Sequence, residues 1–492
     1  YRLNQYDKAY ANLKLAANAK KLSTEGLHDL TISSFESGKY QETVIYAKEA
    51  VADGLDEKRI LFVRGMSLYH SQEYEAAKAD LLRAVENGQK DVRAFTSLGT
   101  IAFGEKEYPQ AITWYSKGLA QGGQVKEIYL KRGEAYAALE NYSEAISDFT
   151  QILTEDKDHD KARFARGKSY FAVKKYDEAT SDLLLVNNKS LDLPVNEIIA
   201  LSYARTNAPR AGEYLQKSIQ LRTESGEIYF HAGRMEAEAG EWEKGIAHLD
   251  IAEEKRYTET ALYEVRGAAH FKGKQYAECL QDLNRSGKNK RLIGLSHYYL
   301  GSYPEAIASL TLVESLDSEG LIALGDAYFN VEKWNEAKSI YDELITSGTV
   351  DAVVYRNRGL VLVGMKQWEP AKTDLQRSLE MDPRNERAVT ALAKVHFALG
   401  ENAQLISLYE QHSETKGLIL FAGLSYYAER DYDKARPLLE EVVRAGAGDL
   451  STEGALGHIQ YLNGSYEEAI RSLTNALGLD DSQTEWKQWK GL

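Results

Sequence analysis

Arginine and aspartate recur along this chain at a fixed separation of sixteen residues. An arginine beside a carboxylate forms a bidentate, charge-assisted hydrogen bond. Paired charges can also serve acid–base catalysis, but no histidine or nucleophile accompanies these residues, and an active site would not recur along one chain. We therefore interpret them as structural ion pairs between two elements of each repeat. The pairs are Arg64–Asp80, Arg132–Asp148, Arg166–Asp182, Arg266–Asp282 and Arg358–Asp374.

The other side chains that could do chemistry lack the spacing that chemistry needs. The phosphate-binding pattern G-x-x-x-x-G-K-[ST], the zinc pattern H-E-x-x-H and the nucleophile pattern G-x-S-x-G are all absent. The single cysteine, Cys279, excludes a disulfide framework and a cysteine-based zinc site. The sequence thus predicts a protein that is not an enzyme, with no catalytic residue, no metal site and no cofactor.

A repeat of 34 residues must position the ion pairs. Apolar residues at spacings of three and four flank a short polar break, which predicts two amphipathic helices per repeat. Glycine costs about 1 kcal/mol relative to alanine inside a helix, so its regular return predicts a close approach between these helices. A small residue follows each glycine after twelve positions, and an aromatic residue follows after nine. The glycines are Gly65, Gly99, Gly133, Gly167, Gly233, Gly267, Gly325, Gly359, Gly423 and Gly457.

The repeat resembles the tetratricopeptide repeat family, whose pattern is W-x2-L-G-x2-Y, then A-x3-F, then P. Leu130, Gly133 and Tyr136, followed by Ala145 and Phe149, match that pattern. The resemblance implies an all-α fold, a right-handed α-solenoid superhelix of about fourteen helix-turn-helix units. It also implies that the first helices of the units line a concave face.

Irregular repeat lengths predict the domain organisation. Residues 1–26 fit the second helix of a truncated leading repeat, which implies further residues before Tyr1 in the natural protein. Residues 27–287 form an N-terminal array and residues 288–481 a C-terminal array, with a bend expected near residues 284–292, where the repeat shortens. Residues 482–492 form a capping tail, in which Trp486 and Trp489 either cover the last repeat or dock a partner.

One position of the first helix, four residues after the glycine, is aromatic in many repeats. A ladder of rings on the concave face would bind an extended peptide or a partner helix. The alternative is that the rings pack between adjacent first helices, and the two interpretations are compatible. The ladder consists of Tyr69, Phe103, Phe171, Phe271, Tyr298, Phe329, Phe397, Tyr427 and Tyr461.

Charge on the same face differs in sign from the whole chain. The chain has 60 Lys and Arg against 74 Asp and Glu, a net charge of -14, which argues against nucleic acid as the main partner because phosphates need a basic surface. The outward positions of the first helices nevertheless carry more basic than acidic residues, which favours a partner with acidic and apolar residues. The basic positions include Arg59, Arg93, Lys168, Arg234, Arg356, Arg387 and Lys394.

These features together predict a scaffold for protein–protein interaction that assembles a multiprotein complex. The alternative is a regulatory or substrate-recruiting arm of a larger enzyme whose catalytic domain lies outside these residues. Self-association through the terminal repeats is a third, weaker interpretation. No apolar run of membrane-spanning length is present. The compartment stays open, with the bacterial cytoplasm and the periplasm or envelope both compatible.

Overall fold

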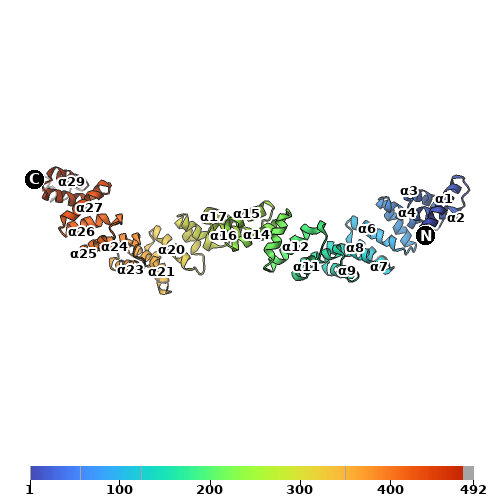
Figure 1. Cartoon of the computed structure of the whole chain (residues 1–492), viewed down its shortest axis with the longest axis horizontal. Helices are drawn as coiled ribbons and strands as arrows, with labels where there is room; N and C mark the ends of the chain where they lie inside the picture. The colour runs from blue at the N-terminus through green and yellow to red at the C-terminus, as the bar shows by residue number, and fades with distance from the viewer. Residues whose placement is uncertain (1, 56, 123–124, 349–350, 480–492) are drawn as a thin grey trace. The chain divides into compact units, whose positions relative to one another are not determined.

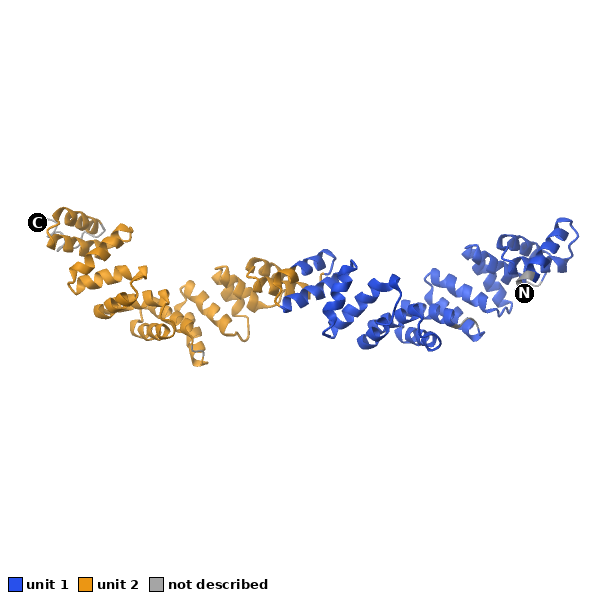
Figure 2. Ribbon diagram, in the orientation of Figure 1, with its two compact units in different colours: residues 1–239, 247–257 blue, residues 240–246, 258–492 orange. Residues whose placement is uncertain are grey.

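The computed structural model is built of α-helices (Figure 1). It describes residues 2–55, 57–122, 125–348 and 351–479, and within these ranges no β-strand occurs. The helices pack as successive hairpins, so the predicted all-α solenoid is confirmed. The chain divides into two compact units, one of residues 1–239 and 247–257 and the other of residues 240–246 and 258–492 (Figure 2).

The first unit begins with a single helix, α1 (Arg2–Asn18), which packs on α2. Hairpins of a first and a second helix follow it, and the last helix of the series, α15, is divided between the two units. The helices are α2 (Thr24–Glu36), α3 (Tyr40–Ala52), α4 (Glu57–His70), α5 (Tyr74–Glu86), α6 (Val92–Gly104), α7 (Tyr108–Ala120), α8 (Val125–Ala138), α9 (Tyr142–Glu155), α10 (Asp160–Ala172), α11 (Tyr176–Leu183), α12 (Asp192–Arg205), α13 (Ala211–Gln220), α14 (Gly226–Glu238) and α15 (Trp242–Glu254).

The second unit continues the same order of first and second helices. Short 3₁₀ turns occur at Lys189–Leu191 in the first unit and at Lys416–Leu418 here. The helices are α16 (Thr260–Lys272), α17 (Tyr276–Ser286), α18 (Lys290–Tyr299), α19 (Tyr303–Leu310), α20 (Ser318–Asn330), α21 (Trp334–Thr346), α22 (Ala352–Gly364), α23 (Trp368–Met381), α24 (Glu386–Leu399), α25 (Asn402–Gln411), α26 (Ile419–Ala428), α27 (Tyr432–Arg444), α28 (Leu450–Leu462) and α29 (Tyr466–Leu479).

Helices α2 to α29 pair into fourteen hairpins over the described residues, the number expected from the repeat. A residue with left-handed backbone joins the two helices of most hairpins, and this explains why glycine recurs in the break. Gly240 has a φ of +88°, whereas Lys106 has a φ of +63° at the same position of another hairpin. Pro109 and Pro304 lie in the first turn of second helices, where a missing N–H leaves no hydrogen bond unmade.

The repeated glycine lies where the two helices of a hairpin touch. A Cβ atom built on Gly133 would lie 2.6 Å from Cε1 of Phe149, and one on Gly65 would lie 2.8 Å from Cγ of Leu81. The contacting residue is the large side chain sixteen positions after the glycine, and it is Leu, Phe or Tyr. The small residue twelve positions after the glycine is itself fully buried, as Ala145 shows. The close approach is thus made by a glycine and a large side chain.

The structure joins each arginine to the aspartate sixteen residues later. Nε and Nη2 of Arg166 donate to the two carboxylate oxygens of Asp182, each at 2.7 Å. All five aspartates are buried. The same two-pronged geometry occurs in Arg64–Asp80, Arg132–Asp148, Arg266–Asp282 and Arg358–Asp374.

The preceding hairpin is also held by Arg132, Arg166 and Arg358. Nη1 of Arg166 donates to Oγ1 of Thr150 at 3.1 Å, and Nη1 of Arg132 donates to Oγ of Ser116 at 2.9 Å. Nη1 of Arg358 donates to a carboxylate oxygen of Asp342 at 2.8 Å. Each acceptor lies sixteen residues before its arginine, on the second helix of the hairpin before. One guanidinium therefore ties three helices together, which fixes how successive hairpins stack.

The predicted boundary at residues 287 and 288 falls within the second compact unit. At this place α17 ends at Ser286 and is followed by Gly287, a C-cap with left-handed backbone. Asn289 caps α18 by accepting from the N–H of Leu292. The four predicted segments and the bend between them stay predictions. The tail of residues 482–492, with Trp486 and Trp489, lies outside the described residues.

Candidate protein-binding face

The rings of the predicted ladder are held by a second ring in their own hairpin. Phe103 lies 5.4 Å from Tyr108, centroid to centroid, in an edge-to-face arrangement across the turn, and Phe329 lies 5.3 Å from Trp334. Apart from Phe397, every ladder ring has such a partner five residues later. The remaining pairs are Tyr69–Tyr74, Phe171–Tyr176, Phe271–Tyr276, Tyr298–Tyr303, Tyr427–Tyr432 and Tyr461–Tyr466.

Several ladder rings also contact the next first helix. Phe397 packs on Phe421 at 5.5 Å, and the guanidinium of Arg205 lies over the ring of Phe171 at 4.8 Å. The hydroxyl of Tyr427 lies 2.7 Å from Nδ1 of His458. Phe271 is buried, whereas the other ladder rings are half-buried or exposed. The rings therefore pack between hairpins and most keep an edge in solvent, while contact with a partner stays a prediction.

The predicted basic residues fall into two groups. Arg93 is engaged within the chain, because Nη2 donates to Asp91 at 2.8 Å and the guanidinium lies over Phe62 at 5.2 Å. Arg234 reaches Glu238 at 3.8 Å, and Nε of Arg356 donates to Asn357 at 3.0 Å. The exposed residues Arg59, Lys168, Arg387 and Lys394 make no ion pair with any described residue.

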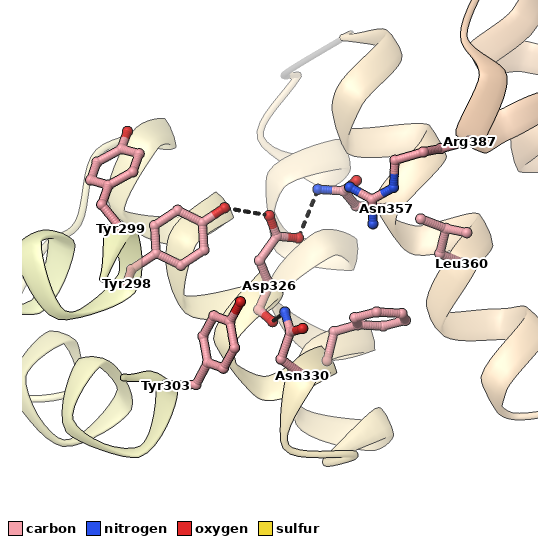
Figure 3. A pocket seen from close by; sticks show the side chains of 9 residues that line it. Tyr298, Tyr299, Tyr303, Asp326, Asn330, Asn357, Leu360 and Arg387 are labelled. Atoms are coloured by element: carbon pink, nitrogen blue, oxygen red, sulfur yellow. Dashed lines mark hydrogen bonds between the residues drawn. The ribbon is translucent and has the colours of Figure 1, made fainter. Parts of the chain in front are cut away.

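We use the term first-helix face for the exposed side chains of the first helices in each unit. In the second unit this face is hollowed by two adjoining pockets. The smaller pocket has a volume of about 320 Å³ and extends from α18 to α24 (Figure 3). It is lined by Tyr298, Tyr299, Tyr303, Asp326, Phe329, Asn330, Asn357, Leu360 and Arg387.

The Asp326 carboxylate organises the smaller pocket. Figure 3 shows Tyr298 and Asn357 both directed at it: the Tyr298 hydroxyl donates at 2.9 Å and the Asn357 amide at 2.8 Å. The buried Tyr341 hydroxyl donates a third hydrogen bond to it. Burial, together with the Asp326 charge, raises the pKa of Tyr298 and of Tyr341. Both phenols therefore stay protonated and keep donating at neutral pH.

The larger pocket has a volume of about 600 Å³ and mostly apolar walls. It lies along α20, α22, α24 and α26 and shares three residues, Phe329, Leu360 and Arg387, with the smaller one. Gly364 lets the Trp334 ring lie flat against α22, since a Cβ there would be 3.1 Å from the ring. The remaining lining residues are Trp334, Val363, Gly364, Glu386, Thr390, Ala391, Lys394 and Phe421.

Sequence reasoning found part of this surface. The structure brings the predicted residues Tyr298, Phe329, Arg387 and Lys394 into the two pockets. Tyr69, Phe103 and Phe171 belong to the other unit and do not line these pockets. Asn357 was missed because it occurs once and does not repeat, so the 34-residue pattern carries no signal for it.

The comparison with protein families accords with this geometry. The model described as "Tetratricopeptide repeat" matches residues 62–125, 130–186 and 422–483. These segments lie in both units and follow the helical hairpins of the structure. These three segments of the chain are tetratricopeptide repeats.

Three curated relatives match parts of the chain, and one of them is named for the same repeat. The chain is 20% identical over 191 residues to small glutamine-rich tetratricopeptide repeat-containing protein 2 of Saccharomyces cerevisiae. It is 27% identical over 131 residues to the Hsp70-Hsp90 organizing protein of Triticum aestivum, and 25% identical over 130 residues to the mitochondrial import receptor subunit TOM70 of Rattus norvegicus. The matches cover 39%, 26% and 25% of this chain. They span 53% of the yeast protein and 21% of each of the other two.

Solved structures resemble the chain at low identity. One described as Naa15/Naa10 bound to HypK-THB is 11% identical, with a TM-score of 0.36 and 95% of both chains covered. One described as the APC/C hetero-tetramer Cut9-Hcn1 is 14% identical, with a TM-score of 0.34 and 98% of both chains covered. Within the described residues of our chain, no helix is long and apolar enough to cross a membrane, and no cluster of three or more His, Cys, Asp or Glu could hold a metal ion.

Proposed function

We propose that this tetratricopeptide repeat chain is a protein–protein interaction scaffold that binds its partners along the first-helix face. The repeat segments support the general role, and one curated relative is named for the same repeat. The observation that carries the choice of face is the combination of half-exposed rings with unpaired cations. Lys168 and Lys394 occupy the same repeat position, are exposed, and make no ion pair with a described residue.

The ladder rings suit a partner that offers apolar side chains. Each ring is braced by its neighbours, so it loses little conformational freedom on binding, and aromatic side chains are enriched at the energetic centres of interfaces. The cations lie beside the rings and select for acidic residues, because a complementary charge speeds association and excludes like-charged partners. The alternative of an arm that recruits substrates to a larger enzyme would use the same surface.

A charge-reversal experiment tests the face. Lys168→Glu combined with Lys394→Glu changes the net charge of the first-helix face by -2 in each unit, or -4 in total. We expect the amount of protein captured by the immobilised chain to fall at least tenfold, as measured by quantitative mass spectrometry at constant salt. The substitutions are on exposed side chains, so circular dichroism should show an unchanged helical fold.

The matched control places the same charge change on second helices. Lys48 and Arg471 are exposed on α3 and α29 and make no ion pair with a described residue. Lys48→Glu with Arg471→Glu should leave the captured proteins within about twofold. The proposal is wrong if the control pair abolishes capture and the first-helix pair leaves it intact.

A further inference from the structure

The two pockets of the second unit form one continuous groove. They share Phe329, Leu360 and Arg387, and together they extend over the first helices α18, α20, α22, α24 and α26. Because every lining residue belongs to the second unit, the groove does not depend on how the two units are arranged. A ligand that fills both pockets must be elongated, which is the shape of a peptide segment.

The acidic residues of the groove are stabilised by the protein, whereas its basic residues are not paired with a described residue. Asp326 accepts hydrogen bonds from Tyr298, Tyr341 and Asn357, so its carboxylate is already solvated by the protein. Glu386 is exposed in the first turn of α24, where the helix dipole stabilises a negative charge. Arg387 and Lys394 have no such compensation, since neither makes an ion pair with a described residue. The partner that these two cations lack in the groove is therefore a carboxylate.

Arg387 fixes where that carboxylate would lie. It lines both pockets, so it stands at their junction rather than at one end. Lys394 follows two helical turns later on the same face of α24 and lines only the larger pocket. A carboxylate at the junction, with chain continuing into the pocket on either side, comes from the side chain of an internal residue. A free C-terminus at this place would leave one pocket empty.

The lining residues of the larger pocket indicate which side chain of the peptide lies next to the carboxylate. The larger pocket offers Trp334, Val363 and Phe421 around a volume of about 600 Å³, enough for one large apolar side chain. We propose that this groove binds an internal peptide segment in which a large apolar residue lies within three positions of a glutamate or aspartate. The apolar side chain enters the larger pocket, and the carboxylate contacts Arg387 and Lys394. This inference rests on the proposed function and names the partner chemistry of that same face.

A peptide array tests the groove with the full chain. The probes are acetylated and amidated ten-residue peptides in a glycine–serine background, with one Leu, Phe or Trp and one Glu or Lys at every pair of positions. We expect the strongest binding for an aromatic or leucine residue within three positions of Glu. Replacing that Glu by Lys should weaken binding at least tenfold, because Lys would face two unpaired cations.

Variants assign the binding to the groove. Arg387→Glu should lower the affinity for the best peptide at least tenfold and remove its preference for Glu over Lys. Arg384→Glu makes the same charge change on an exposed residue three positions away that does not line either pocket, and it should alter affinity less than twofold.

Three outcomes would overturn the inference. They are equal binding of Glu and Lys peptides, unchanged binding to Arg387→Glu, and tighter binding of peptides whose only carboxylate is a free C-terminus. The proposed function would survive any of these if the double substitution at Lys168 and Lys394 still abolishes protein capture, so the two failures are distinguishable.

Discussion

Replacing Asp282 by leucine is expected to destabilise the α16–α17 hairpin by about 3–5 kcal/mol. The Asp282 carboxylate holds the guanidinium of Arg266 through two hydrogen bonds of 2.8 Å. The exposed fractions of the two side chains are only 8% for Arg266 and 4% for Asp282. Removing the acid alone takes these two hydrogen bonds from a guanidinium that is held away from water, so the desolvation of its charge is no longer offset by them.

A double substitution separates this ion pair from simple packing. Arg266→Leu with Asp282→Leu removes both charges, so it should recover much of the loss caused by Asp282→Leu alone. The quantity to measure is the free energy of local opening of α16 and α17 from native-state amide hydrogen exchange. A single unfolding midpoint is less informative, because stacked repeats need not unfold in one step.

The control for the buried ion pair is a solvent-exposed arginine–glutamate pair on the protein surface. Arg210 and Glu213 are 53% and 59% exposed with a contact of 3.1 Å, so Glu213→Gln should leave the stability nearly unchanged. If the losses of Arg266→Leu and Asp282→Leu simply add in the double variant, the two residues do not act as a pair.

Glycine to alanine is expected to change stability in opposite directions at two positions. At Gly133 the new Cβ would lie 2.6 Å from the Phe149 ring, which must then move. Overpacking costs about 1–3 kcal/mol, and alanine's better helix propensity returns about 1 kcal/mol, so Gly133→Ala should be destabilising overall. At Gly118, inside α7, the nearest atom would be 3.5 Å away, an ordinary contact. Gly118→Ala should therefore stabilise its helix by about 0.5–1 kcal/mol.

Hydrogen exchange in α7, α8 and α9 measures both substitutions in one region of the chain. A second substitution, Phe149→Ala, should relieve the crowding caused by Gly133→Ala. The double variant should therefore lose less stability than the two single variants lose together. A stabilising Gly133→Ala would show that the helices of the hairpin do not meet at the glycine.

The fold was predictable because its determinants repeat. Each glycine and each Arg–Asp pair recurs at the same position, so the chain contains its own comparison set, and pairs that come and go together indicate contact. The brace between Phe103 and Tyr108 was also within reach, since both ring positions repeat and lie five residues apart across the turn. The hydrogen bond from Arg166 to Thr150 was not, because its acceptor varies in type between hairpins.

The candidate site was less predictable for the same reason. Asp326 and Asn357 occur at their positions in single hairpins, so periodicity carries no information about the hydrogen bond that joins them. Whether a surface arginine has an acidic partner also differs from one hairpin to the next. Arg93 pairs with Asp91, whereas Arg387 does not pair with any described residue. A pocket depends on which side chains are missing or small, as at Gly364, and that requires the assembled surface.

Fluorine NMR of the chain labelled with 5-fluorotryptophan tests binding at the first-helix face most directly. Trp334 lines the larger pocket, whereas Trp114 and Trp242 lie outside both pockets. With the best-binding array peptide added to saturation, the Trp334 resonance, assigned by its loss in Trp334→Phe, should shift while those of Trp114 and Trp242 stay in place. A shift at Trp114 or Trp242 with Trp334 unchanged would contradict the account.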